Sequence, residues 1–421
     1  MSDPRDPQLD EGAAPEESTP GLPPHDAVET QLGAPSVAQR LALWQKAGGV
    51  VTPVVTALVA FFVGGLVVLA TTGNNPLSTY KGIFQGTGLD WLFPWVTGDQ
   101  RMLAALNLQQ TLLVSTPLVL TGLAVAFAFR CGLFNIGGQG QYIVGAIVSV
   151  WVGSSFAGMA GPLHQAIAIV AAMLAGAVFA GIAGLLRATV GAHEVITTIM
   201  LNWVAYWGGS YLFGLGGPLQ NPAEPDVPVS SDVVDGAHLH VFWGDPVLQG
   251  LHIGFFIAIG ALVAYWITLN RTTLGYRVRA VGFNPDAARY GGISVARSYF
   301  LAMAISGLFA GLAGAMDVLG WEFRINVNDI QASQIGFVGI AVALLGRNTA
   351  VGTFLAAILF GALVNGTSTR NLDPNIFRPD LASNLTLLIQ GLVVLFVGAD
   401  VLVLYFWIRF RRHVLRKAAT T

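Results

Sequence analysis

Amide and aromatic side chains are concentrated in two otherwise apolar segments, GLFNIGGQGQYIVGA from Gly132 and HEVITTIMLNW from His193. Amides exchange hydrogen bonds and an indole ring offers a flat face for stacking, so this combination suits a neutral, ring-containing solute better than an ion. The candidates for lining a solute path are Asn135, Gln139, Gln141, Glu194, Asn202 and Trp203. Hydrogen bonding between packed helices would explain any one of these amides equally well.

Glycines in the first segment predict an interrupted helix. Gly132, Gly137, Gly138 and Gly140 fall close together in the sequence. Glycine permits close backbone approach and backbone conformations that end a helix, and such breaks occur inside membrane proteins where they are buried or line a cavity. We therefore expect a broken helix next to the solute path.

Patterns for catalysis and for nucleotide binding are missing from the sequence. A P-loop needs a Lys preceded by Gly and followed by Ser or Thr, but Lys46, Lys81 and Lys417 follow Gln, Tyr and Arg. The histidines and the single cysteine, Cys131, show no metal-ligand spacing. We therefore expect that this chain is not an enzyme, has no ATPase site and binds no metal or cofactor.

Ionisable residues are rare inside the apolar blocks, where each costs about 2.5 to 3.5 kcal/mol on insertion. Glu194 is predicted in the first turn of a helix, where capping and a gating or solute-contact role compete as explanations. Asp317 and Asp400 are predicted near the ends of their spans, at the membrane interface. This scarcity argues against a proton- or sodium-coupled carrier, because such carriers need carboxylates within the membrane.

Composition predicts an all-α, polytopic integral membrane protein. The 421 residues are 54% hydrophobic and 10% charged, whereas soluble domains carry about 25% charged residues. We expect about ten spans, each near the length that crosses a bilayer. They are centred on residues 50–71, 108–129, 136–157, 164–186, 195–215, 250–269, 299–320, 335–346, 350–366 and 384–406, of which the eighth and ninth are short enough to form a bent or re-entrant pair.

The basic residues set the expected orientation, because cytoplasmic loops are enriched in Lys and Arg. With the N-terminus in the cytoplasm, all but five of the 21 basic residues lie on the cytoplasmic side, the exceptions being Lys81, Arg101, Arg324, Arg370 and Arg378. We expect a disordered, acidic, Pro-rich cytoplasmic tail over 1–40, a membrane domain over 41–410 and a basic cytoplasmic tail over 411–421. The expected external loops are 73–106 and 216–249.

The arginine-rich cytoplasmic loop at 270–298 contains a predicted short helix. Asn284 is a favourable N-cap, Pro285 suits the first helical position, and Gly291 with Gly292 ends the turn. Ala287 and Ala288 would present a small-sided surface to a groove on a partner. A solvated loop stabilised by its arginines is the alternative.

This loop resembles the coupling loop of ABC-importer permeases of the branched-chain amino acid, simple sugar and nucleoside group. The matching pattern is Gly282, Asn284, Ala287, Ala288, Gly292 and Ile293. The resemblance extends over most of Leu103 to Asp400, and the segments from Gly132 and His193 are most similar to nucleoside-type permeases. The family motif often has Glu where this chain has Gln139, so no carboxylate role is carried over to that position.

The resemblance implies a permease subunit of the bacterial plasma (inner) membrane that takes up nucleosides by alternating access, using ATP hydrolysed by a separate ATPase subunit. The implied partners are that ATPase, a second identical or different permease subunit, an extracytoplasmic substrate-binding lipoprotein and the lipid bilayer, with no nucleic acid. The alternatives are a sugar or branched-chain amino acid permease of the same group, or an autonomous ion-coupled carrier. An intramembrane enzyme is a third class, for which the sequence offers no catalytic residues.

Overall fold

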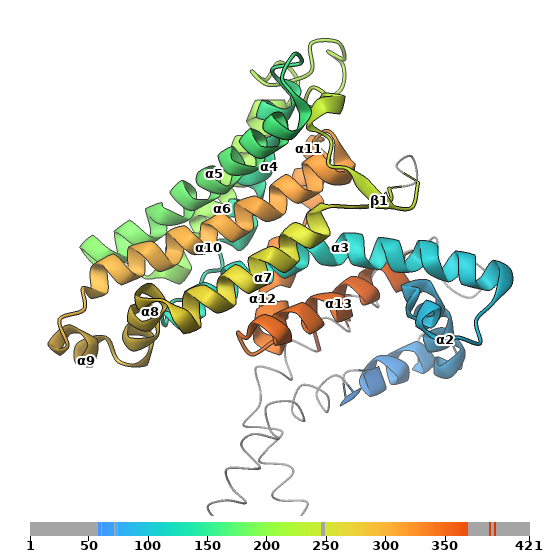
Figure 1. Cartoon of the computed structure of the whole chain (residues 1–421), viewed down its shortest axis with the longest axis horizontal. Coiled ribbons are helices and arrows are strands. Elements are labelled where there is room, and N and C mark those ends of the chain that lie inside the picture. The colour runs from blue at the N-terminus through green and yellow to red at the C-terminus, as the bar shows by residue number, and fades with distance from the viewer. Residues whose placement is uncertain are drawn as a thin grey trace, which may run out of the picture. The chain divides into compact units, whose positions relative to one another are not determined.

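The computed structural model describes residues 58–368, apart from 60, 71, 72, 74 and 246–248, together with 387, 388, 391 and 392 (Figure 1). The predicted tails at 1–40 and 411–421, most of the tenth span at 384–406 and the first part of the span at 50–71 lie outside the described residues.

The described chain is almost entirely helical, with one short β-hairpin. Its elements are α2 (Pro76–Thr87), η3 (Leu89–Leu92), α3 (Gly98–Arg130), α4 (Gly138–Ser154), α5 (Gly161–Val190), α6 (Glu194–Phe213), η4 (Asp235–Ala237), β1 (Val241–Trp243), β2 (Leu251–His252), α7 (Gly254–Arg271), α8 (Thr273–Phe283), α9 (Pro285–Tyr290), α10 (Val295–Asp317), η6 (Val318–Glu322), α11 (Val327–Ala332), α12 (Ile335–Leu345) and α13 (Ala350–Gly366). The two strands pair antiparallel.

Within the described residues, five helical segments are long and apolar enough to cross a bilayer: Gly98–Arg130, Gly161–Val190, Gly254–Arg271, Val295–Glu322 and Val327–Leu345. Phe61–Ala70 and Ala350–Gly366 are shorter apolar helices. Each span predicted within 98–366 corresponds to an observed helix whose ends agree to within a few residues, except that α3 begins ten residues before the span expected at 108–129. The total of ten spans remains a prediction.

Two intervals expected as loops contain helices. Residues 73–106 form α2, η3 and the first turns of α3, and Asn75 caps α2 by accepting a hydrogen bond from the Leu77 amide at 2.9 Å. In the arginine-rich interval 270–298, α8 precedes the predicted short helix. Both additions are weakly apolar segments, and we based the span prediction on apolar runs.

The bundle has two ends, which lie about 40 Å apart along α10 and η6, over the 28 residues from Val295 to Glu322. One end carries α8 and α9, and we call it the α9 end. The other carries β1, β2 and α11, and we call it the hairpin end (Figure 1). The α9 end holds the cluster of arginines that predicted a cytoplasmic position, while the membrane orientation itself stays a prediction.

Helices α5 and α10 run side by side through backbone contact (Figure 1). A Cβ atom on Gly307 would overlap the carbonyl oxygen of Gly176, and one on Gly176 would overlap that of Gly307. In lipid, helix association depends on such close packing, because the lipid tails are as apolar as the side chains. Gly176 of α5 and Gly307 of α10 therefore meet in direct backbone contact.

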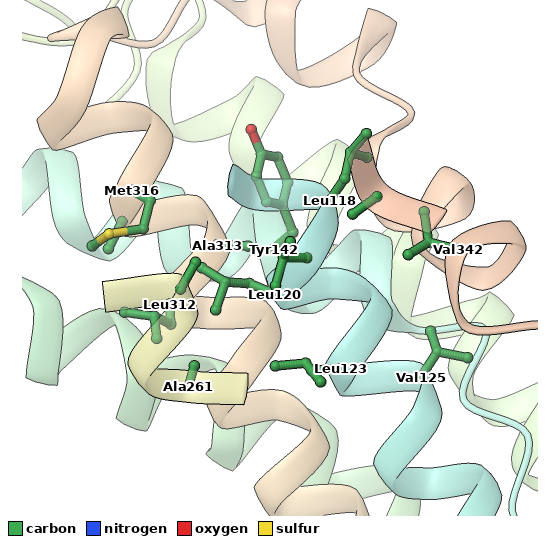
Figure 2. Close-up of a cluster of buried hydrophobic side chains, with 14 of the residues drawn as sticks. Leu118, Leu120, Leu123, Val125, Tyr142, Ala261, Leu312, Ala313, Met316 and Val342 are labelled. Carbon is green, nitrogen blue, oxygen red and sulfur yellow. The ribbon is translucent and has the colours of Figure 1, made fainter. Parts of the chain in front are cut away.

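The buried core lies where α3 meets four neighbouring helices. Figure 2 shows side chains of α3 packed against those of α4, α7, α10 and α12. They are Leu118, Leu120, Leu123 and Val125 of α3, Tyr142 of α4, Ala261 of α7, Leu312, Ala313 and Met316 of α10, and Val342 of α12, all of them buried. The core thus connects the α5–α10 pair to α3, and α3 to α12.

Two segments cross the bundle as broken helices. After α3 the chain runs without helix from Cys131 to Gly137, and Asn135 reaches Ser306, eleven residues into α10, before α4 begins. The second break separates α11 from α12 at Ser333 and Gln334. The predicted interruption at the glycines of the first segment is therefore present, and a second one faces it.

We predict that Gly307→Val lowers the thermal stability of the detergent-solubilised protein, because the added side chain must force α5 and α10 apart. Overpacking of this kind costs about 1 to 3 kcal/mol, or more where backbone must move. Gly260→Val on α7 is the matched control, since a Cβ there meets no atom within 4 Å. Equal melting temperatures for the two variants would contradict the close contact.

Candidate functional site

Gln139 joins the two broken helices to each other. Its amide nitrogen donates to the carbonyl oxygen of Ser333 at 2.9 Å, and its amide oxygen accepts from the Gly336 amide at 2.7 Å. Gln139 is fully buried, and it supplies the acceptor for the Gly336 amide and the shorter of two hydrogen bonds to the Ser333 carbonyl. One side chain therefore bonds to the first turn of α12 and to Ser333, two residues before that helix.

Asn135 and Gln141 form a second amide pair at the start of α4. The Asn135 amide nitrogen donates to Gln141 Oε1 at 2.9 Å and to Ser306 Oγ at 2.7 Å, while the Gln141 amide nitrogen donates to Asn135 Oδ1 at 3.0 Å. Ser306 Oγ in turn donates to the Ala124 carbonyl oxygen at 2.5 Å. This network fixes the unwound segment between α3 and α4 against α10.

Asn202 attaches α6 to the same region. Its oxygen accepts from the Gly140 amide at 2.8 Å and its nitrogen donates to the Ile136 carbonyl oxygen at 3.0 Å. Asn135, Gln139, Gln141 and Asn202, which we predicted as path residues, thus share one place in the fold, and all four are buried. Their hydrogen bonds hold the helix breaks in place, while contact with a solute stays a prediction.

An aromatic groove lies beside this network, along α6. It has a volume of about 520 Å³ and is bordered by Asn202, Trp203, Tyr206, Trp207 and Phe337, among others. Trp203 is 54% exposed, so its ring is free for stacking, and it packs against Tyr206 with ring centroids 5.8 Å apart. Of the predicted path residues, Asn202 and Trp203 border this groove.

Glu194 lies away from the groove, in the first turn of α6 at the α9 end. Its carboxylate approaches Arg187 Nε at 3.5 Å, and the Arg187 guanidinium lies 5.7 Å from the centre of the Tyr299 ring. This arrangement joins the ends of α5, α6 and α10. No side-chain capping hydrogen bond forms at the start of α6, so the capping and solute-contact explanations of Glu194 both stay predictions.

Asp317 is buried inside the protein at the last residue of α10, and its depth relative to the membrane stays a prediction. It is 1% exposed, and its carboxylate accepts hydrogen bonds from the Tyr142 hydroxyl at 2.6 Å and from the Trp321 indole nitrogen at 3.1 Å. These two donors explain how a carboxylate is accommodated there. Asp400 lies outside the described residues.

The predicted short helix is present as α9. The Asn284 side chain accepts from the amides of Asp286 and Ala287, both at 3.0 Å, and Pro285 is the first helical residue. Gly292 adopts a positive φ of 78° after the helix ends, a conformation that side chains disfavour. Local capping chemistry was therefore sufficient to predict this element.

The two alanines of α9 have different environments. Ala288 is only 6% exposed and packs into the protein's own core, whereas Ala287 faces outward. The expectation that Ala288 is presented to a partner is therefore wrong, because that side of α9 rests on this chain. The exposed surface instead includes Ala287 and two flanking aromatic residues, Phe283 at 94% and Tyr290 at 95% exposure.

Gly282 places α8 directly on the end of α3. A Cβ at Gly282 would overlap the carbonyl oxygen of Arg130, so only glycine permits this contact. Arg130 also donates to the Asn348 carbonyl oxygen at 2.7 and 3.0 Å, which holds the turn between α12 and α13. Gly282, in the last turn of α8, thereby touches the chain just ahead of the unwound segment that contains Asn135.

Sequence reasoning missed Tyr206 and Ser333. The Tyr206 hydroxyl donates to the Ser333 carbonyl oxygen at 3.4 Å, beside the Gln139 bond to the same atom. Tyr206 and Trp207 follow Trp203 at helical spacing, which could have extended the predicted aromatic face along α6. Ser333 carries no sequence signal, because the break between α11 and α12 contains no glycine.

Within the described residues, no group of His, Cys, Asp or Glu side chains is arranged to hold a metal ion.

Apolar helices of spanning length and helix breaks joined by buried amides are the features of a multi-pass helical membrane protein. The comparisons with known proteins specify its family. The family described as branched-chain amino acid transport system / permease component matches residues 107–398. The chain belongs to this family of permeases.

Three relatives from different organisms match most of the chain. A guanosine ABC transporter permease protein of Bacillus subtilis (strain 168) is 34% identical over 350 residues, which cover 83% of this chain and 92% of the relative. A nucleoside ABC transporter permease protein of Lactococcus lactis subsp. cremoris (strain MG1363) is 32% identical, covering 84% and 92%. A glucose ABC transporter permease protein of Haloferax volcanii is 34% identical, covering 82% and 86%. No solved structure gives a significant match.

We predict that Gln139→Leu lowers the melting temperature by removing the partner of the Gly336 amide, an omission that costs about 1 to 3 kcal/mol. Gln139→Glu should be milder, because it keeps an oxygen for Gly336 and, when protonated, donates to Ser333. Gln331→Leu is the control, since Gln331 is exposed and bonds only to Ser210 Oγ, at 3.3 Å. If thermal unfolding in detergent affects Gln331→Leu as much as Gln139→Leu, the amide bridge is not a major support.

Proposed function

We propose that this chain is the transmembrane subunit of an ABC importer that takes up nucleosides across the bacterial plasma membrane. The observation that carries the proposal is the aromatic groove beside a buried amide network, in a family whose similar members include guanosine and nucleoside permeases. Nucleosides are neutral and carry a flat base, so stacking surfaces and amides suit them without a counter-charge.

A second permease subunit would close the aromatic groove. The outer face of α6 exposes Ile196, Met200, Trp203, Val204, Trp207 and Tyr211, which follow helical spacing on one side. With a second subunit opposite this face, two grooves would enclose a path at the subunit boundary. We propose such a dimer, identical or mixed, working with an extracytoplasmic binding lipoprotein.

The energy source in this proposal is a separate ATPase subunit that docks at the α9 end, on the cytoplasmic side. The exposed Phe283, Ala287 and Tyr290 offer aromatic anchors around a small residue, a composition that is common at the centres of protein interfaces. Docking moves α9, and the Gly282 contact with Arg130 carries that displacement to the segment that holds Asn135. The amide network then rearranges together with the ends of α3 and α4.

Sugars are the second candidate substrates, because the glucose permease of Haloferax volcanii is as identical to this chain as the guanosine permease. The groove favours nucleosides through its several aromatic rings, although sugars also stack on tryptophan. Competition experiments separate the two classes directly.

We predict that Ala287→Glu prevents co-purification of the ATPase, since a carboxylate without a partner at a buried contact costs several kcal/mol. Tyr290→Ala should weaken the association by about tenfold or more, as expected for an aromatic anchor. Phe156→Ala, which alters an exposed aromatic residue between α4 and α5, is the matched control and should leave the association intact. Substrate-stimulated ATP hydrolysis in proteoliposomes provides the second measurement. Normal assembly of Ala287→Glu would show that α9 is not the docking element.

We predict that Trp203→Leu reduces nucleoside uptake by about tenfold or more without lowering thermal stability, because the half-exposed ring supports no buried contact. Asn202→Ala should reduce both uptake and stability, since it also releases the Gly140 amide and the Ile136 carbonyl. Uptake of labelled guanosine is measured with unlabelled uridine, glucose, ribose or leucine as competitors. Inhibition by leucine or sugars but not by uridine would assign a different substrate class.

A further inference from the structure

A cavity of about 390 Å³ opens at the hairpin end, apart from the aromatic groove. Trp321 and Glu322 from the end of η6 border it, together with Asp329 of α11 and Glu224 of the segment before β1. A smaller space of about 30 Å³ adjoins it and reaches Tyr142 and Ser333. Glu322 and Asp329 border both spaces, so together they form one depression that leads toward the α11–α12 break. We call it the outer cavity.

The polar groups of the outer cavity are not all used by the protein. Arg324, the basic residue at its rim, pairs with Glu224 at 3.4 Å and Asp232 at 3.7 Å. Within the described part of the chain, Glu322 forms neither a hydrogen bond nor an ion pair, and the buried Ser333 hydroxyl has no hydrogen-bond partner. Buried polar groups are normally satisfied, so an orphaned hydroxyl at the floor of a cavity indicates a ligand or water.

The shape and charge of the outer cavity restrict what could bind. Its volume lies in the range of small-molecule sites, which are about 300 to 1,000 Å³. Trp321 offers a ring whose orientation is fixed by the indole hydrogen bond to Asp317. The carboxylates accept hydrogen bonds and repel anions, and no described acidic cluster has the arrangement of a metal site. A neutral ligand rich in hydroxyl donors and carrying a flat ring face fits these groups.

We propose that the outer cavity receives the transported solute and selects for a vicinal diol on a ring, with the diol hydroxyls donating to Glu322 and Ser333. The ring would stack on Trp321. A ribonucleoside and a simple sugar share this diol chemistry, whereas a branched-chain amino acid lacks it. This inference rests on the proposed import function and adds a selective contact on the hairpin side of the bundle.

The test compares guanosine with 2′,3′-dideoxyguanosine, using the complete transporter with its ATPase and binding protein in proteoliposomes. We expect the ratio of their kcat/KM values to fall by about tenfold in Glu322→Gln, because an NH2 donor replaces a carboxyl oxygen that accepts from the diol, a contact that the dideoxy compound never makes. Ser333→Ala should lower the ratio in the same direction. The binding protein is the same in every sample, so a changed ratio belongs to the permease.

Asp235→Asn is the control, because Asp235 is an exposed carboxylate of the hairpin end that does not border the outer cavity. A second pair, ribose and 2,3-dideoxyribose, applies the same comparison if the wild type takes up sugars. Wild-type nucleoside or sugar uptake with unchanged ratios in Ser333→Ala and in assembled Glu322→Gln would overturn the diol site and leave the proposed function standing. Wild-type uptake of leucine alone would overturn both. Should Glu322→Gln fail to assemble, the Ser333→Ala ratio decides.

Discussion

Every backbone amide and carbonyl group inside a bilayer must find a partner within the protein, and this requirement governs the centre of the molecule. The two helix breaks leave the Gly336 amide, the Ser333 carbonyl, the Gly140 amide and the Ile136 carbonyl without the partners of a continuous helix. Gln139 and Asn202 supply those partners. Because each amide bonds two backbone groups on another segment, the breaks can exist only in register with one another. The positions of α4, α6, α11 and α12 follow from these few hydrogen bonds.

The unwound segment from Cys131 to Gly137 connects the two functional regions through a short piece of chain. At its beginning, Gly282 rests against the Arg130 carbonyl, and farther along Asn135 bonds Gln141 and Ser306. A short segment that is held at both ends transmits a displacement more directly than a long unattached loop would. In the proposed mechanism, a displacement of α9 would therefore reach the amide network through direct contacts.

Sequence patterns located most of the observed spans because apolar runs of sufficient length have few alternatives in lipid. Asn284, Pro285 and the following glycines likewise predicted α9, since capping is a local property. The patterns did not reveal which side of α9 faces the protein, and Ala288 was assigned to the wrong surface. They also could not distinguish an amide that supports a helix break from one that contacts a solute, because both need a polar group on a buried face. Whether a buried amide supports a helix break or contacts a solute depends on its hydrogen-bond partner. The partners of Gln139 and Asn202 lie far away in the sequence.

The structure separates a rigid frame from short elements that depend on few contacts. Helices α5 and α10 touch backbone to backbone along their small faces, and moving either one would break many contacts at once. By contrast, α11 has six residues and is held by a capping box at Asn326, by Ile330 packed near Gly209 and by the bond from Gln331 to Ser210. It lies between the outer cavity and the aromatic groove, since Asp329 borders the first and Gln331 the second. Local opening has its lowest free energy where buried contacts are few. We therefore expect α11 to move when solute access changes from the outer cavity to the aromatic groove.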